Sequence, residues 1–127
     1  MAADFTLELA PEPEATRIAR NEVGDRLAQR LDGRVHDAEL LISELIANAI
    51  KHGSPDRHGR ITLEVTLEPG TVRFEVTDAG RGFRSSPRPD AQDPASGWGL
   101  YLVDRIADRW GASREAGHTR VWFELDA

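Results

Sequence analysis

The chain has 127 residues, of which 39% are hydrophobic, and a formal net charge of -6 at pH 7. This length suits a single domain over 1–127, and the negative charge makes duplex nucleic acid a poor partner, because phosphate binding depends on clustered Lys and Arg. The absence of cysteine excludes disulfides and thiolate metal sites, and no apolar run approaches the roughly 18 residues of a membrane span.

One short strand and one long helix are predicted at the start of the chain. Apolar residues alternate with polar ones over 5–9, which favours a strand, and two prolines separate it from a helix over 14–31. Asp32-Gly33 ends this helix. Four of its apolar residues recur at helical spacing, which predicts that they face the core: Ile18, Val23, Leu27 and Leu31.

A second long helix is predicted over 35–52, closed by Gly53 as a left-handed C-terminal residue. Six apolar residues share one broad arc of this helix and predict its buried face: Ala38, Leu41, Ile42, Leu45, Ile46 and Ala49. Glu44, Asn48 and Lys51 stack at i, i+4 and i+7 on another arc. The helix is therefore expected to carry a polar stripe above a packed face.

The clearest hairpin of the sequence follows. Apolar and polar residues alternate over 61–68 and again over 72–77, and Pro69-Gly70 supplies the turn between them. Each strand has one apolar and one polar face. The sheet is therefore expected to be covered by helices on one side and open to water on the other.

The last third of the chain predicts a loop, a helix and a strand. Three prolines and the lack of periodicity make 84–95 an exposed loop. A third helical stripe is predicted to end at Gly111 and consists of Leu100, Val103, Ile106, Ala107 and Trp110. After a turn at Gly117-His118, alternation over 121–125 predicts a final strand.

The second helix holds the first of three segments that carry chemistry. Glu44 and Asn48 lie one turn apart, as residues of a solvated helix face also would. A carboxamide suits a hard cation that keeps some of its waters, and a carboxylate one turn away could polarise a water or a hydroxyl. This segment alone does not decide between the two interpretations.

The second segment, at the end of the hairpin, is Asp78-Ala79-Gly80-Arg81-Gly82-Phe83. A plain turn at positive φ accounts for its glycines. The same glycines would also let a flat base approach the backbone. The Asp78 carboxylate could then accept a hydrogen bond from an exocyclic amino group, which adenine has and guanine replaces by a carbonyl.

The third segment, Ser96-Gly97-Trp98-Gly99-Leu100, opens the third helix. Free N–H groups and the positive end of the helix dipole attract phosphate oxygens at such a start. A helix capped by Ser96 without any ligand is the alternative. Taken together and in this order, the three segments indicate a site for ATP and its magnesium ion.

The three segments resemble the nucleotide-binding boxes of the GHKL superfamily of ATPases and kinases, which shares the Bergerat fold. The resemblance extends to Gly117-His118-Thr119-Arg120-Val121, where Thr119 matches a threonine that assists the adenine-binding aspartate. Within the superfamily, the chain resembles the anti-sigma factor serine kinases of the RsbW and SpoIIAB type. The resemblance implies an α+β two-layer sandwich, with a mixed, mostly antiparallel sheet of four or five strands backed by about three helices.

The resemblance also implies roles for the matching residues. Asn48 is expected to bind magnesium, Glu44 to serve as the catalytic base and Asp78 to read adenine, with 84–95 as the ATP lid. Further ATP-binding residues implied by the match are Lys51, His52, Gly80, Gly82, Phe83, Gly97, Trp98, Gly99, Leu100 and Thr119. The implied partners are a sigma factor and an anti-sigma antagonist, competing for a homodimer, and Arg17 is a candidate partner contact.

Three functions stay open at this point. The first is a protein-serine kinase that sequesters a sigma factor and phosphorylates its antagonist. The second is a non-catalytic nucleotide-sensing module. It is favoured by Ala95, because kinases of this type can carry an arginine at that position, where it reaches the terminal phosphate. In a kinase, Arg84 or Arg88 would have to take over this contact. The third, the catalytic piece of a sensor histidine kinase, is disfavoured because no dimerisation helix with a phosphoacceptor histidine precedes the boxes. Without a secretory leader, we expect a cytoplasmic protein.

Overall fold

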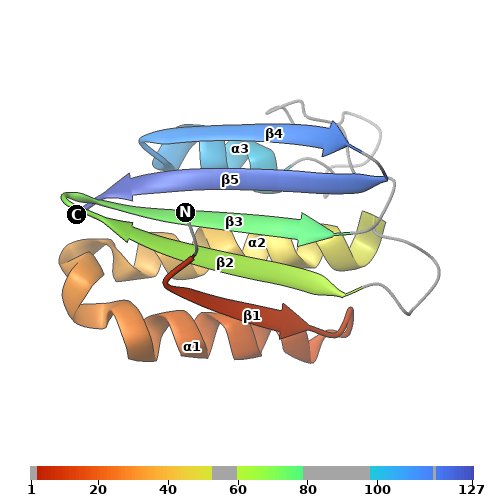
Figure 1. The fold of residues 1–127 in the computed structure, drawn as a ribbon, viewed down its shortest axis with the longest axis horizontal. Helices are drawn as coiled ribbons and strands as arrows, with labels where there is room; N and C mark the ends of the chain where they lie inside the picture. The colour runs from red at the N-terminus through yellow and green to blue at the C-terminus, as the bar shows by residue number, and fades with distance from the viewer. Residues whose placement is uncertain (1–2, 53–59, 79–97, 116) are drawn as a thin grey trace.

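The computed structural model describes residues 3–52, 60–78, 98–115 and 117–127. In chain order, the elements are β1 (Phe5–Leu9), α1 (Glu14–Leu31), the 3₁₀ turn η1 (Asp32–Arg34), α2 (Val35–His52), β2 (Ile61–Glu68), β3 (Thr71–Asp78), α3 (Trp98–Ile106), β4 (Arg109–Glu115) and β5 (His118–Asp126). The strands form one sheet with the helices behind it (Figure 1). The expected α+β two-layer architecture is confirmed.

The sheet has the strand order β1-β2-β3-β5-β4, and every neighbouring pair is antiparallel. Gly70 turns β2 into β3 at φ 76°, and Gly117 turns β4 into β5 at φ 78°. Glycine adopts this left-handed conformation without the clash that a Cβ would cause. The hairpin predicted around Pro69-Gly70 is therefore confirmed, with Thr71 opposite Glu68 next to the turn.

The core lies between the helices and the inward face of the sheet. Every second residue of β3 and β5 is buried, and the rings of Phe74 and Phe123 stack with their centroids 4.8 Å apart. Burying such a ring stabilises the fold by roughly 1.5–3 kcal/mol. The predicted apolar arc of α2 supplies the facing layer, and all of it is buried: Ala38, Leu41, Ile42, Leu45, Ile46 and Ala49.

The prediction for α1 was wrong at one residue. Ile18 is 42% exposed, whereas the buried stripe repeats at every fourth position: Ala15, Ala19, Val23, Leu27 and Leu31. Two of these are alanines, so a pattern of large apolar residues does not include them. Small side chains let a helix pack closely, so the first half of α1 buries its alanines and leaves Ile18 at the surface.

The third helix is shorter than its apolar stripe predicts. α3 ends at Ile106, and Trp110 and Gly111 belong to β4, where Trp110 lies opposite Phe123. The indole N–H of Trp110 donates to Asp104 of α3 at 3.0 Å, which fastens the strand to the helix. Pairing with β5 therefore overrides the helical spacing, because the backbone of 109–115 forms a full ladder there.

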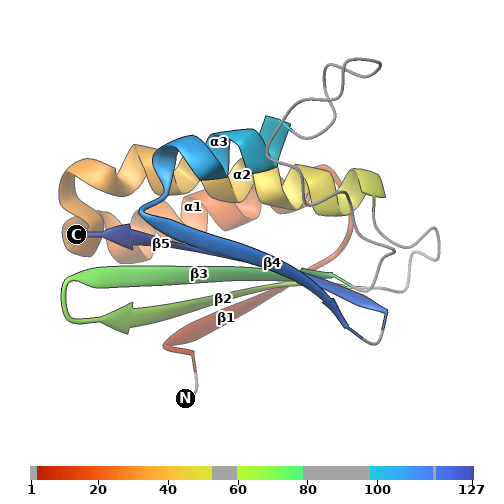
Figure 2. The ribbon, with the colours of Figure 1, turned by 90° about the horizontal axis from the view of Figure 1, so that it is seen from above.

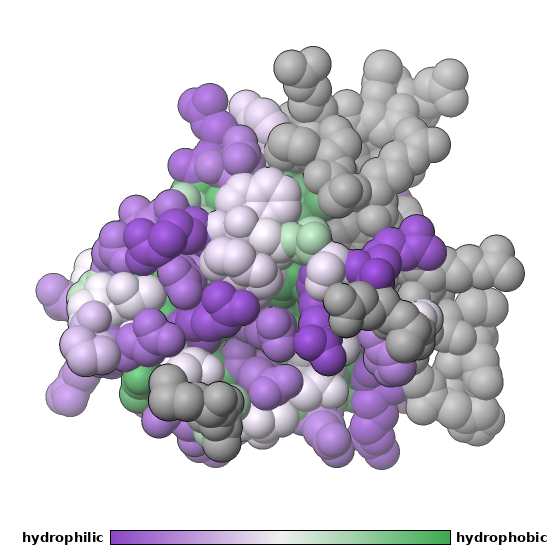
Figure 3. Space-filling view, turned by 45° about the horizontal axis from the view of Figure 1, so that its top comes forward, coloured by the Kyte–Doolittle hydropathy of each residue, from purple (hydrophilic) through white to green (hydrophobic). Residues whose placement is uncertain are grey.

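The other face of the sheet is polar, as predicted. All three helices lie on one side of the sheet (Figure 2). On the open side, the Arg73 guanidinium lies 4.2 Å from the ring centre of Trp122, and a Cβ on Gly111 would come within 2.7 Å of the Trp122 Nε1. Hydrophilic side chains dominate the space-filling view, with hydrophobic ones visible only in small areas (Figure 3). Within the described ranges, no helix has the length and apolar character needed to span a bilayer.

Candidate functional site

The predicted site residues that the structure describes gather at one end of the molecule. α2 and β3 finish there, and β5 and α3 begin there (Figures 1 and 2). The antiparallel pairing of β3 with β5 makes Asp78, the last residue of β3, the Cα partner of Thr119. Topology thus brings together segments that are far apart in the sequence.

Asp78 and Thr119 both point into the protein. Asp78 is 5% exposed and Thr119 is 2% exposed. Asp78 occupies the inward phase of β3, directly after Val76 in the row of buried residues. A carboxylate in the apolar phase of a strand is stable there only where hydrogen bonds or a charge compensate its burial. The sequence contains this signal, because Asp78 continues the alternation of the strand.

Asn48 of α2 is also buried, at 7% exposure. Its neighbours on the predicted polar stripe differ from it, since Glu44 is half-buried and Lys51 is exposed. The stripe is therefore not one solvated face. Along the stripe, the carboxamide of Asn48 is buried, whereas the side chain of Lys51 is exposed.

Two polar atoms at this end are buried without a partner. Within the described part of the chain, neither Nδ2 of Asn48 nor Oγ1 of Thr119 has a hydrogen bond. Each such group costs about 1–3 kcal/mol of stability. Folded proteins keep unsatisfied groups of this kind mainly where function requires them. The pair therefore marks this end as a candidate binding site.

The start of α3 borders the same end. Leu100 is fully buried in the core, so its side chain anchors the helix start and only its backbone is available to a ligand. Trp98 and Gly99 lie in the first turn of α3 and His52 in the last turn of α2, and only their backbone is described. Four predicted residues and the predicted lid over 84–95 fall outside the described residues: Gly80, Gly82, Phe83 and Gly97.

A metal ion at this end would depend on few protein ligands. In the described ranges, no group of three His, Cys, Asp or Glu residues is placed to hold a metal. Mg²⁺ commonly keeps several waters and takes one or two protein oxygens together with phosphate oxygens. The buried carboxamide of Asn48 fits such a sparse site.

Ion pairs with shifted pKa values lie at the opposite end. Arg34 donates to Asp37 at 2.9 Å, to Asp108 at 2.9 Å and to the Ile106 carbonyl at 3.0 Å. The pKa of Asp108 is lowered, first by the hydrogen bond from the Asp126 backbone N–H and then by the one from Arg34. Partial burial works against the charge of Arg34, but its hydrogen bonds to Asp108 and Asp37 outweigh burial and raise its pKa.

Arg109 completes this group at the same end. Its hydrogen bonds to Asp126 and Glu124 raise its pKa. Every one of these shifts comes from groups that pair with each other, which is the pattern of a structural network. The network therefore serves the fold.

Comparison with known proteins agrees with this geometry. Residues 9–125 match the family model described as "Histidine kinase-like ATPase domain". The chain is 30% identical over 117 residues to an Anti-sigma F factor of Clostridium botulinum, covering 82% of this chain and 80% of that protein. It is 24% identical over 119 residues to the Serine-protein kinase RsbW of Listeria monocytogenes, covering 82% and 75% respectively.

A solved structure shows the same fold. The RsbU and RsbW domains of a Mycobacterium tuberculosis protein superpose with a TM-score of 0.73 at 23% identity. The match covers 96% of this chain and 32% of the mycobacterial chain, so this chain spans about a third of that protein. The chain therefore belongs to the histidine kinase-like ATPase domain family. The predicted GHKL membership and the resemblance to anti-sigma factor kinases are confirmed.

Proposed function

We propose that the chain is an ATP-dependent anti-sigma factor that phosphorylates an antagonist protein on serine. ATP and Mg²⁺ would lie between the C-terminal half of α2 and the ends of β3 and β5, under a lid formed by 84–95. The names of two relatives, Anti-sigma F factor and Serine-protein kinase RsbW, support this function. The proposal includes a homodimer, a sigma factor as its bound partner, Arg17 as a contact to that partner, and action in the cytoplasm.

The adenine end of the site rests on Asp78 and Thr119. A buried carboxylate accepts a hydrogen bond from the amino group of adenine, whereas the carbonyl of guanine would meet it as a second acceptor. The Thr119 hydroxyl, on the neighbouring strand, can donate to the same ring system. Its Oγ1 lacks a hydrogen bond within the described ranges, as expected of a group whose hydrogen-bond partner is the bound ligand.

The phosphate end rests on α2 and on the start of α3. Mg²⁺ bound to ATP neutralises charge on the phosphate oxygens. Asn48 would hold this ion through its carboxamide, and the first backbone N–H groups of α3 would face the phosphates. Glu44 lies one turn before Asn48 on α2 and is half-buried, so its carboxylate can accept a proton from an incoming serine hydroxyl.

The observation that carries the proposal is the pair of unsatisfied polar atoms on Asn48 and Thr119. They belong to different elements, and Thr119 is the Cα partner of the buried Asp78 at the end of β3. A ligand that forms hydrogen bonds with these two atoms removes the cost of their burial, and this gain adds to its affinity. The remaining residues of the proposed pocket, Gly80, Gly82, Phe83 and Gly97, enter it from the sequence match.

Phosphotransfer is tested with labelled ATP and the cognate antagonist. In Glu44→Gln, the rate of label transfer is expected to fall about 100-fold or more, because the general base is lost, while ATP affinity changes little. Glu22→Gln is the matched control, since Glu22 is a half-buried glutamate of α1 that pairs with Arg26. Transfer at the parent rate by Glu44→Gln would remove Glu44 from its proposed role.

The sequence also favours a second function at the same site. Ala95 stands where kinases of this type can carry an arginine, so the chain could bind ATP and use it only to set the affinity for its partner. The same assay separates the two functions. ATP binding without label transfer by the parent protein would establish the sensing module in place of the kinase.

A further inference from the structure

The junction between α1 and α2 contains an aspartate in an unusual backbone conformation. Asp32 has φ 50° and ψ -119° and is the one residue other than glycine with positive φ in the described ranges. These angles match the first central position of a type II′ turn, which favours glycine. The next residue is Gly33, and both residues are exposed. Asp32-Gly33 is the single Asp-Gly pair of the sequence, which has no Asn-Gly.

The ψ angle of Asp32 has a chemical consequence. In an L-residue, Cβ lies about 120° anticlockwise of the backbone nitrogen around the Cα–C bond. A ψ of -119° therefore eclipses Cβ with the nitrogen of Gly33. The four atoms from Cβ of Asp32 to N of Gly33 are then nearly coplanar, which is the arrangement that a five-membered ring through Cγ requires.

The fold holds the junction in this conformation from both sides. The Asp32 N–H donates to the Ala28 carbonyl, and the Asp32 carbonyl accepts the N–H of Val35. Arg30 donates to the carbonyls of Thr71 at 3.1 Å and Ala127 at 2.6 Å, and also to that of Glu68. On the other side, Arg34 contacts Asp37, Asp108 and the carbonyl of Ile106. A conformation that is costly for aspartate persists where its surroundings over-determine it.

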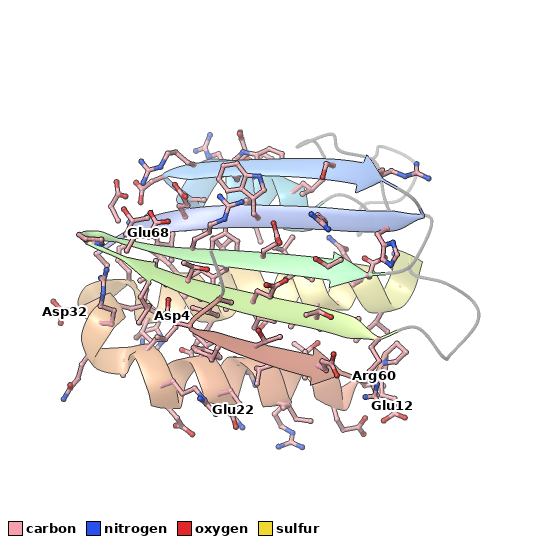
Figure 4. The ribbon with its side chains drawn as sticks, viewed as in Figure 1. Asp4, Glu12, Glu22, Asp32, Arg60 and Glu68 are labelled. Carbon is pink, nitrogen blue, oxygen red and sulfur yellow. The ribbon has the colours of Figure 1, made fainter. Side chains whose placement is uncertain are left out.

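Access to the junction is open. In the stick view, Asp32 lies at the outer end of the turn and its carboxylate points away from the helices and the sheet (Figure 4). A Cβ built on Gly33 would meet no heavy atom within 4 Å. A side chain at Gly33 would therefore stand in open space, and both residues of the junction are exposed, so water can reach the product.

We propose that Asp32-Gly33 is a site of spontaneous succinimide formation and conversion to isoaspartate, promoted by the folded backbone. The amide nitrogen of Gly33 loses its proton and bonds to Cγ of Asp32, and the protonated carboxyl group releases one oxygen as water. Water then opens the ring. Cleavage between Gly33 N and Cγ restores aspartate, whereas cleavage between Gly33 N and the main-chain carbonyl leaves Gly33 linked through Cγ as isoaspartate.

The product has a defined chemical character. It adds one carbon to the main chain between Arg30 and Arg34 and frees an α-carboxylate at Asp32. Such a carboxylate is the substrate of an isoaspartyl methyltransferase that uses S-adenosylmethionine. This enzyme with labelled S-adenosylmethionine therefore serves as the probe, and peptide mapping locates the label.

The experiment ages the folded chain and the same chain in urea at neutral pH and physiological temperature. Because ψ near this value is sparsely populated in an unfolded chain, label at Asp32 is expected to accumulate about tenfold faster in the folded protein. Asp25 in α1, followed by Arg26, is the internal control and should stay unlabelled. Equal or slower accumulation in the folded protein would overturn the proposal.

A second variant assigns the label. Asp32→Glu keeps the charge, but its carboxyl group would have to close a six-membered ring, so label at this position is expected to fall to the background of Asp25. Persistent label at the junction of Asp32→Glu would show that another group reacts, and would also overturn the proposal.

Discussion

The two ends of the sheet treat their polar groups in opposite ways. At the end where α1 turns into α2, the side chains of Arg30 and Arg34 reach backbone carbonyls of the β2–β3 hairpin, of α3 and of the last strand. At the other end, Asn48 and Thr119 keep buried polar atoms without partners in the described ranges. One end satisfies its polar groups within the fold, whereas the other holds buried polar groups that are left for the proposed nucleotide.

Removal of Arg34 should have the largest effect on stability. Arg34→Met keeps the apolar stem but removes the Arg34 hydrogen bonds to Asp37, to the carbonyls of Ile106 and Asp126, and one of the two hydrogen bonds that Asp108 accepts. The free energy of unfolding is expected to fall by about 2–3 kcal/mol. Urea denaturation measures this loss. Arg26→Met is the matched control, because Arg26 makes one exposed pair with Glu22 and one contact with the Phe5 ring at 4.9 Å, and its loss should cost no more than about 1 kcal/mol.

If Arg34→Met and Arg26→Met destabilise the protein equally, the contrast between the two ends loses its energetic basis. The two variants remove the same charge and differ in the partners and the burial of the arginine. An effect of charge alone would therefore appear in both.

Thr119→Val should act in opposite directions on stability and on binding. The substitution keeps the shape of the side chain and removes the unsatisfied hydroxyl, so the ligand-free protein is expected to gain about 1 kcal/mol. ATP affinity is expected to fall about tenfold, because a hydrogen bond to the nucleotide is lost. Thermal denaturation and calorimetric titration give the two quantities. A variant that is less stable without ATP would show that the hydroxyl is already satisfied in the fold.

The smallest effect expected is the acid dependence of the Arg34 network. The pKa of Asp108 is lower in the folded state than in the unfolded state. The ionised carboxylate therefore adds to the free energy of unfolding above the unfolded pKa of about 3.9, and this stabilisation is lost as the pH falls through the folded pKa. The difference in unfolding free energy between the parent and Asp108→Asn should therefore shrink below about pH 4. Partial exposure of Asp108 keeps the effect small.

A pH series of urea denaturation curves checks this expectation. A difference that grows on acidification would mean that Asp108 is not held in its charged form by Asp126 and Arg34.

Local pattern predicted most of the fold. Alternation of apolar and polar residues predicted strands β2 and β3, and the apolar arc predicted helix α2. In each case the pattern also predicted the buried face, because it repeats over several strand residues or over two or more helical turns. β4 was missed because Trp110 continues the helical spacing of α3 and the following residues do not alternate. Only the pairing partner β5 decides the conformation of this segment, and that information lies elsewhere in the chain.

The candidate site was predicted in part. Two of the three boxes named Asn48 and Asp78 through residue type and order, and the match at 117–121 added Thr119. The structure places all three, buried, in the last turns of α2, at the end of β3 and at the start of β5. The sequence did not reveal that Asn48 turns inward while Lys51 stays exposed, because both lie on the same arc of an ideal helix. Burial of a single polar residue depends on how α2 tilts on the sheet, which spacing alone does not determine.

Nucleotide selectivity tests the central claim most directly. Calorimetric titration with ATP and with GTP, each with Mg²⁺, should show that the parent protein prefers ATP, and that Asp78→Asn loses about 100-fold in ATP affinity together with most of that preference. Asp25→Asn, on the exposed side of α1, should bind like the parent. Unchanged ATP affinity and selectivity in Asp78→Asn would contradict a nucleotide site at this end of the sheet.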